Sequence, residues 1–265
     1  MHDTLLSLVE RAIARQIRPL EFYLREHSRL PGSRANLELA DDVAHLLACV
    51  STEQPERVQE LIRYFVRHEQ SDSLGNTPDE FIVLCGIIAL GVCAVARVEW
   101  REEAIVQLNH FACSSSWRVR EGAATAYQHL LEAYPQPTLV ALRQLAVTGN
   151  FLQQRAAVAA VAEPKLLYTV EMQTQAFDLQ KIVLEHIPQV PFTQRKCEDF
   201  KILRRALGFT LSVITVADPR AGFTLMRECA AWKDEDVKWI LRENLKKKRL
   251  ARFKQDTASV LELLL

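Results

Sequence analysis

The residues best suited to chemistry lie in one basic stretch, residues 234–253, which reads DEDVKWILRENLKKKRLARF. On a helix with 3.6 residues per turn, Trp239, Arg242 and Lys246 fall on one stripe, opposite a stripe of apolar residues. An aromatic ring flanked by cations can stack on a nucleobase while the cations contact phosphates. The same ring could instead pack beneath the apolar residues 260–265, and packing is the interpretation that we favour for Trp239.

The acidic residues that open this stretch could also take part in catalysis. Asp234, Glu235 and Asp236 could stabilise a positive charge that develops on a sugar. Helix capping explains them more simply, because their oxygens accept from free N–H groups and suit the positive end of the helix dipole. Asn244 lies in the apolar stripe and is predicted to be a buried amide with its hydrogen bonds satisfied. No catalytic residue is assigned.

Other chemical motifs are missing from the sequence. The seven histidines are dispersed, without an H-E-x-x-H pattern or a Cys/His cluster at ligand spacing. There is no Gly-rich phosphate loop and no G-x-S-x-G elbow. We therefore expect no metal site and no cofactor.

Charge is balanced over the whole chain but not along it. Residues 1–133 carry 13 Lys and Arg against 19 Asp and Glu, whereas residues 134–265 carry 20 against 14. The first lysine is Lys165. A basic C-terminal half could attract an anionic partner, and DNA is one such partner.

The six cysteines show no C-x-x-C spacing, and most of them lie in apolar runs, where a thiol behaves as a small hydrophobic side chain. Residues 1–12 lack the basic and apolar regions of a secretory signal. We expect reduced thiols and a cytoplasmic protein. Residues 81–96 (FIVLCGIIALGVCAVA) contain no charge, but a membrane-spanning helix needs about 20 such residues. We expect a buried core helix and no membrane contact.

Helices account for the rest of the pattern. The chain has only eight glycines, and its prolines lie mostly between apolar-periodic runs, which predicts an all-α protein. Pro19 should divide the opening run into two helices or kink one helix. Asn36 is a predicted N-cap. Thr77, Pro78 and Glu80 predict a helix start with a closed capping box.

An internal repeat emerges when the chain is compared with itself at an offset of 118 residues. Residues of similar size then coincide: Ala104, Leu108, Ala112 and Val119 fall on Gly222, Met226, Ala230 and Val237. Matched small and large residues are what stacked helices require. Five predicted second helices begin with the apolar residues Phe81, Val119, Leu152, Phe200 and Val237, a spacing of about 40 residues, close to that of HEAT and armadillo repeats.

Two of these segments, SWRVREGAATAYQHL (116–130) and DEDVKWILRENLKKKRL (234–250), resemble HEAT repeats. The resemblance implies an all-α fold, an α-α superhelix or HEAT/armadillo-like solenoid of about six helical hairpins. It implies a single domain over 1–265, with divergent helices in 1–75, the repeat array in 76–255 and a C-terminal tail in 256–265. A looser similarity to the HEAT-like bacterial alkylpurine DNA glycosylases implies a basic concave surface with aromatic residues and a carboxylate.

In such superhelices the second helix of each pair lines the concave surface. The basic and aromatic residues on those helices are therefore the candidates for binding a nucleic acid or another partner: Arg118, Arg120, Arg155, Lys201, Arg204, Arg205, Lys238, Trp239, Arg242 and Lys246. Together they could form a cationic groove for a phosphate backbone. Ordinary solvated helix faces explain the same residues equally well.

Two functional hypotheses follow from these patterns. The first is a non-catalytic binding or scaffold protein that holds a protein partner on its concave face. The alternative is a DNA-binding protein of the alkylpurine glycosylase type, in which case the chain is an enzyme.

Overall fold

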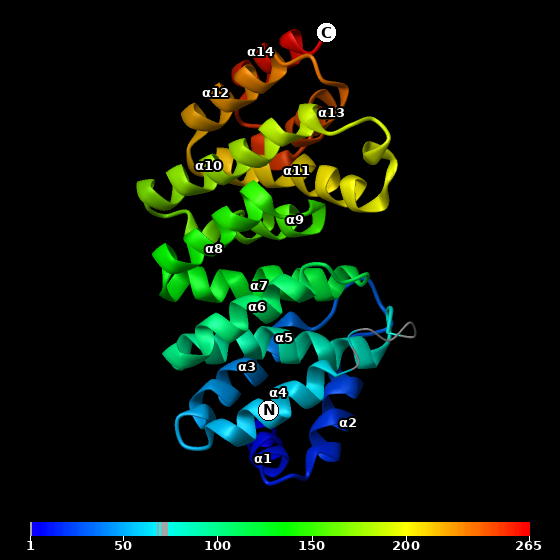
Figure 1. Ribbon diagram of the computed structural model, residues 1–265, viewed down its shortest axis with the longest axis vertical. Helices are drawn as coiled ribbons and strands as arrows, with labels where there is room; N and C mark the ends of the chain where they lie inside the picture. The colour runs from blue at the N-terminus through cyan, green and yellow to red at the C-terminus, as the bar shows by residue number, and fades with distance from the viewer. Residues whose placement is uncertain (1, 68, 70–73) are drawn as a thin grey trace. The chain divides into compact units, whose positions relative to one another are not determined.

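The computed structural model describes residues 2–67, 69 and 74–265, and every regular element among them is a helix (Figure 1). The all-α class with repeated helical pairs is thereby confirmed. The chain divides into two compact units, Met1–Pro135 and Gln136–Leu265. The sequence predicts one domain with internal boundaries after residues 75 and 255, and both of these positions lie inside a unit.

Unit 1 is built around one helix. Its members are α1 (His2–Ile13), α2 (Ile17–His27), α3 (Leu37–Ser51), α4 (Pro55–Val66), α5 (Pro78–Ala96), α6 (Arg101–Phe111) and α7 (Trp117–Ala133). Helix α5 contacts α2, α3, α4, α6 and α7, and its side chains from Glu80 to Ala94 are all buried. By length and composition alone this helix could cross a membrane, but 83% of its most apolar window is buried inside unit 1. The burial agrees with the predicted core helix.

Unit 2 is arranged around α11. It contains α8 (Pro135–Thr148), α9 (Phe151–Ala160), α10 (Val170–His186), α11 (Glu198–Ala217), α12 (Pro219–Ala230), α13 (Glu235–Leu245) and α14 (Lys254–Leu263). Helix α11 packs against α9, α10, α12 and α13. Residues 256–265, predicted as a tail, belong mostly to α14, which packs on α12.

The predicted repeat corresponds to real helical pairs. The offset of 118 residues matches α6 and α7 with α12 and α13, and all eight matched residues are buried. The five markers of second helices lie in the first turns of α5, α7, α9, α11 and α13, and each of these side chains is also buried. The periodicity in the sequence therefore reports the packed face of each helix.

Helix starts are predicted better than helix ends. Asn36, Thr77 and Asp234 each accept a hydrogen bond from the backbone of the helix that they precede. The opening run does divide, but at residues 14–16, and Pro19 is accommodated in the first turn of α2, where its missing N–H costs little. The helix predicted over 234–253 ends at Leu245, and Lys247 is extended.

Close approach between helices in unit 1 depends on small residues. A Cβ added to Gly91 of α5 would lie 2.7 Å from the Ala126 Cβ and 2.8 Å from the Ala126 Cα and carbonyl oxygen. Because two of these atoms belong to the backbone of α7, a side-chain rotation cannot relieve the clash. The glycine sets the distance between α5 and α7.

We predict that Gly91→Ala destabilises unit 1 by about 1–3 kcal/mol, because overpacking outweighs the gain in helix propensity of about 1 kcal/mol. Urea denaturation, monitored by circular dichroism, should show a lower midpoint for the unfolding of unit 1. Gly75→Ala is the control, since no atom lies within 4 Å of its added Cβ. Equal midpoints for the two variants would contradict this account.

Five of the six cysteines fall into two groups that chemistry can distinguish, and Cys113 is intermediate in exposure. Cys85, Cys93 and Cys229 are buried, and burial raises the pKa of each thiol, to about 12 for Cys93 and Cys229. Cys49 and Cys197 are exposed. A thiol with a pKa of 12 is ionised to an extent on the order of 10⁻⁴ at pH 8, and the thiolate is the reactive form.

We predict that a thiol reagent such as Ellman's reagent labels Cys49 and Cys197 rapidly at pH 8 in the folded chain. Cys85, Cys93 and Cys229 should become reactive only in denaturant. Mass spectrometry of the labelled peptides measures this directly, and rapid native labelling of Cys93 would show that the core of unit 1 opens.

Candidate functional site

The segment between α2 and α3, residues 28–36, forms one side of a pocket in unit 1. Hydrogen bonds hold this segment near both of its ends and at Gly32. The Leu30 amide donates to the Ser28 hydroxyl over 3.0 Å, and the Asn36 side chain donates to the His27 carbonyl over 2.9 Å. The Gly32 amide donates to Asn76 Oδ1 over 3.0 Å. These hydrogen bonds hold the segment in one conformation, and we refer to residues 28–36 below as the wall of the pocket.

A buried ion pair supports this wall. Arg118 Nη1 lies 2.8 Å from Glu80 Oε2, and the two side chains are 4% and 1% exposed. The other guanidinium nitrogen, Nη2, donates to the Gly32 carbonyl over 2.5 Å and to Asn76 Oδ1 over 3.2 Å. Arg118 thus connects the start of α7 with α5 and with the 28–36 segment.

Glu80 has a larger role than its cap position predicts. Thr77 caps α5, but the Glu80 carboxylate accepts from the Asn76 amide rather than from the amide of the cap residue, so the predicted capping box does not form. The same carboxylate accepts from the Ser116 hydroxyl over 2.5 Å and from Arg118. The hydrogen bonds that Glu80 accepts from Ser116 and Arg118 are not predicted from the sequence, because a local helix cap already accounts for Glu80.

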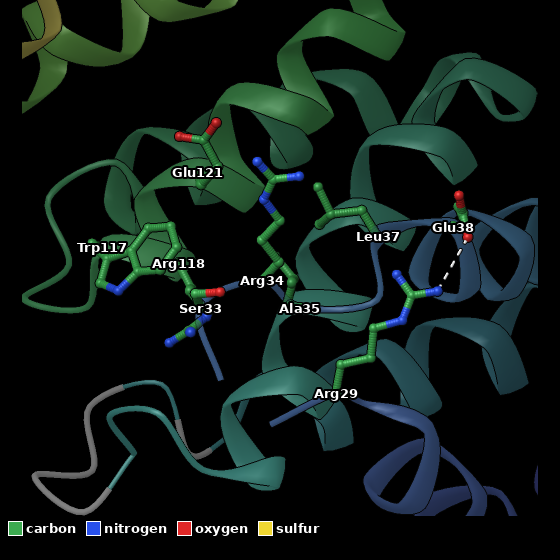
Figure 2. A pocket seen from close by; sticks show the side chains of 10 residues that line it. Arg29, Ser33, Arg34, Ala35, Leu37, Glu38, Trp117, Arg118 and Glu121 are labelled. Atoms are coloured by element: carbon green, nitrogen blue, oxygen red, sulfur yellow. Dashed lines mark hydrogen bonds and ion pairs between the residues drawn. The ribbon is translucent and has the colours of Figure 1, made fainter. Parts of the chain in front are cut away.

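The pocket enclosed in this way has a volume of about 410 Å³. Leu84 of α5 is one of its lining residues. Trp117 lies at one end and Arg34 in the middle (Figure 2). Arg29 and Glu38 stand at the other end. The lining residues are Arg29, Ser33, Arg34, Ala35, Leu37, Glu38, Leu84, Trp117, Arg118 and Glu121.

Trp117 is the exception among the tryptophans. The sequence places all four near helix ends and predicts that they pack, and Trp100 is indeed buried. Trp117 is 52% exposed, although the Arg118 guanidinium lies 4.4 Å from its ring centroid. An exposed indole in a pocket that is also lined by an apolar residue, here Leu84, is typical of an anchor point for a partner.

Among the described residues that line the pocket, one cation is left without an ion pair. Arg29 pairs with Glu38 at 3.4 Å, and Arg118 is committed to Glu80. Arg34 is exposed and makes no ion pair or hydrogen bond with the described residues. A guanidinium in this position can bind a carboxylate through two parallel hydrogen bonds. Apolar contact together with one carboxylate is therefore the chemistry that this pocket can recognise.

The structure separates the ten residues that the sequence nominates for binding. Arg118 and Arg120 are buried in unit 1, and Arg120 Nη1 donates to the carbonyls of Ser114 and Ser115 over 2.6 and 2.8 Å. Arg155 of α9 is buried in unit 2. The sequence predicts these three arginines on a partner-binding surface. They are buried instead, which is typical of a structural role.

The other basic candidates lie in unit 2, and most of them face a carboxylate. The pairs are Lys201–Glu198 at 2.7 Å, Arg205–Glu198 at 3.5 Å, Lys238–Glu235 at 3.2 Å, Lys246–Glu243 at 2.6 Å, and Arg204–Asp236. Arg242 donates to the Leu264 carbonyl over 2.7 Å. Hydrogen bonds from Lys201 and Lys246 lower the pKa of Glu198 and Glu243, so the acids remain ionised. A phosphate would have to compete with these carboxylates.

Trp239 packs, and its ring lies close to α11. A Cβ added to Gly208 would lie 3.2 Å from its ring, and the Arg204 guanidinium lies 4.4 Å from its centroid. Arg204 also pairs with Asp236. Among the nominated residues, Arg204 of α11 and Trp239 of α13 contact each other across two helices.

The carboxylates at the start of α13 are occupied by an arginine outside that helix. Arg195 Nη1 lies 2.7 Å from Asp234 Oδ2 and 3.1 Å from Asp236 Oδ2, and its other nitrogens donate to the carbonyls of Pro188 and Val190. Burial lowers the pKa of Arg195, but the hydrogen bonds to both acids outweigh burial and leave it raised. Asp234 and Asp236 therefore stabilise the turn before α13.

Asn244 is the buried amide that the sequence predicts. Its nitrogen donates to the carbonyls of Leu207 and Ile240 over 2.7 and 2.8 Å, and its oxygen accepts from the Ser212 amide over 2.7 Å. The side chain is fully buried and joins α13 to α11.

One group of side chains in unit 1 could hold a metal ion. Asp41 and His45 of α3 and His129 of α7 bring their ligand atoms within 4.8 Å of one another. The sequence did not predict this group, because His129 is far from the other two along the chain.

Comparison with known proteins identifies no family. No protein-family model matches the chain, and no curated protein matches it. Among solved structures, a designed armadillo-repeat protein matches 91% of this chain and 100% of its own length, at 15% identity and a TM-score of 0.30. An engineered protein matches 89% of this chain and 97% of its own, at 15% identity and a TM-score of 0.32.

We predict that Arg118→Met lowers the free energy of unfolding of unit 1 by about 3–5 kcal/mol, because it leaves the buried Glu80 charge without its cationic partner. Chemical denaturation measures this loss. The double variant Glu80→Gln/Arg118→Met should lose less than the sum of the two single variants, and amide exchange in residues 29–36 should accelerate in each of them.

Arg57→Met is the matched control in the same unit. Arg57 pairs with Glu60 at 3.1 Å, but both side chains are exposed to solvent, so the expected loss is at most about 1 kcal/mol. A cost for Arg118→Met as small as that of the control would refute the structural role of the Glu80–Arg118 pair.

Proposed function

We propose that this chain is a non-catalytic binding protein of the HEAT-repeat type that captures a protein segment in the pocket of unit 1. The segment presents an apolar side chain next to a carboxylate. The observation that carries the proposal is that the pocket is lined by exposed Trp117, by apolar Leu84 and by Arg34, which makes no ion pair or hydrogen bond with the described residues.

Each part of the pocket matches one part of such a segment. An apolar side chain can displace water from Leu84 and from the Trp117 ring, and tryptophan is enriched among residues that dominate binding energy. A neighbouring carboxylate can pair with Arg34. The wall of residues 28–36 is already fixed by Arg118 and Asn76, so binding does not have to order it.

The cellular compartment belongs to the same proposal. All six thiols are free, which supports a reducing compartment such as the cytoplasm.

DNA binding, with the glycosylase-type activity that the looser similarity suggests, has less support. Its basic candidates on α11 and α13 are mostly paired with Glu198, Glu235, Asp236 and Glu243. A phosphate backbone gains affinity mainly from cations that release its counterions, and cations already neutralised by carboxylates supply less of that gain.

A peptide library displayed on phage and selected on the full chain tests the proposal. We expect the selected peptides to share an Asp or Glu next to an aromatic or aliphatic residue. Fluorescence polarisation with a selected peptide should show a loss of about 30-fold for Trp117→Ala, which corresponds to roughly 2 kcal/mol. Arg34→Glu should cost at least about tenfold, because it replaces an ion pair by a repulsion.

Two exposed residues provide matched controls. Phe22→Ala removes an exposed aromatic side chain elsewhere in unit 1, and Arg205→Glu reverses an exposed arginine in unit 2. Both should leave peptide affinity unchanged. Peptides that bind all four variants equally would eliminate the pocket as the binding site. Salt-sensitive binding of duplex DNA that is lost on changing Lys238, Arg242 and Lys246 to Glu would favour the DNA alternative.

A further inference from the structure

The face shared by α3 and α7 carries a second group of convergent side chains, beyond the pocket. Asp41 and His45 are four residues apart on α3, so they lie on one face of that helix. His129 reaches them from α7. Both helices pack on α5.

We propose that Asp41, His45 and His129 form a binding site for a divalent transition-metal ion of the zinc class. His129 Nε2 lies 2.9 Å from Asp41 Oδ1, His45 Nε2 lies 3.5 Å from Asp41 Oδ2, and all three ligand atoms lie within 4.8 Å of one another. Tetrahedral zinc with bonds of about 2.0–2.1 Å places its ligand atoms about 3.3–3.4 Å apart. Small side-chain rotations therefore suffice to close the site.

The orientation of the rings suits two imidazoles on one ion. Their centroids are 5.8 Å apart and their planes are inclined by 84°, so the rings meet edge to face and do not stack. In both rings it is Nε2 that approaches the carboxylate. A metal ion would replace the protons between these nitrogens and the Asp41 oxygens, and would bind both imidazoles in the neutral form.

The ligand types select the class of ion. Two imidazole nitrogens and one carboxylate oxygen suit zinc and its transition-metal neighbours, whereas calcium and magnesium require mainly oxygen ligands. Three protein ligands leave a fourth position open, as in zinc sites that bind water or an exchangeable ligand.

Burial gives the site a fixed side and an accessible side. The His129 side chain is 12% exposed, whereas Asp41 and His45 are 44% and 60% exposed. The inner imidazole is held by its surroundings, and an ion can enter from the side of His45. The open fourth position faces the same solvent.

The site also lies on the same helix faces as the pocket. Leu37, Asp41 and His45 follow one another at intervals of four residues on α3, and Glu121 precedes His129 by two turns on α7. The metal proposal does not depend on the pocket having a partner, because it rests on its own three ligands.

The test uses the full chain, free of any affinity tag, stripped with a chelator and dialysed. Calorimetric titration with Zn²⁺ should show one equivalent bound, and Co²⁺ should produce the visible absorption bands of a tetrahedral site with nitrogen ligands. His129→Ala and His45→Ala should each weaken Zn²⁺ binding by at least about tenfold, because each removes a ligand. Asp41→Asn should weaken it to a similar extent.

Matched controls separate these ligands from other acids and histidines. Asp42→Asn changes the exposed neighbouring carboxylate, and His27→Ala removes an exposed histidine that contacts Tyr23. Both should bind Zn²⁺ like the unaltered chain, and circular dichroism verifies the folding of every variant. An absence of Zn²⁺ uptake by the unaltered chain would overturn the proposal, and so would Zn²⁺ affinities of the His45 and His129 variants equal to that of the unaltered chain. Peptide binding to the pocket is measured separately, so either proposal can fail alone.

Discussion

Helix α5 buries side chains on all of its faces, and α2, α3, α4, α6 and α7 are arranged to cover it. Each fully buried Leu, Ile or Phe contributes about 1.5–3 kcal/mol, so the helix is a large source of stability. Because no face of α5 is polar, each face needs a neighbouring helix to shield it from water. Gly91 lets α7 approach closely, and Gly86 does the same for α4, where an added Cβ would meet Phe65 and Val66. The positions of α3 and α7 follow from this packing.

The start of α5 is the place where this apolar core must accommodate charge. Glu80 is buried there, and a lone buried carboxylate would be costly. Arg118, Ser116 and Asn76 supply its partners, and Arg118 then has a nitrogen left to hold the Gly32 carbonyl. The shape of the candidate pocket is therefore a consequence of how the core helix begins. Arg118 therefore both neutralises the buried Glu80 and holds one side of the candidate pocket.

The sequence predicts what is local or periodic. Caps at Asn36, Thr77 and Asp234, the repeated pairs and the buried amide Asn244 all follow from short-range patterns. The Glu80–Arg118 pair could not be predicted, because a complete local cap already accounted for Glu80 and its partner lies 38 residues away. By contrast, the pairing of Lys201, Lys238 and Lys246 with acids three residues earlier was visible in the sequence, and it weakens the case for a cationic groove.

The spacing between α3 and α7 explains why one face can carry both a pocket and a cluster of ligands. The two helices are separated by their common packing on α5, so long side chains rather than backbones bridge them. At the level of Asp41 the bridge is polar and short, 2.9 Å to His129. One turn earlier, at Leu37, no such bridge is present in the described residues, and the 28–36 segment held by Arg118 forms the wall instead. The pocket is thus lined by residues of α3 and α7 near the 28–36 segment, and the Asp41–His129 contact lies further along the same two helices.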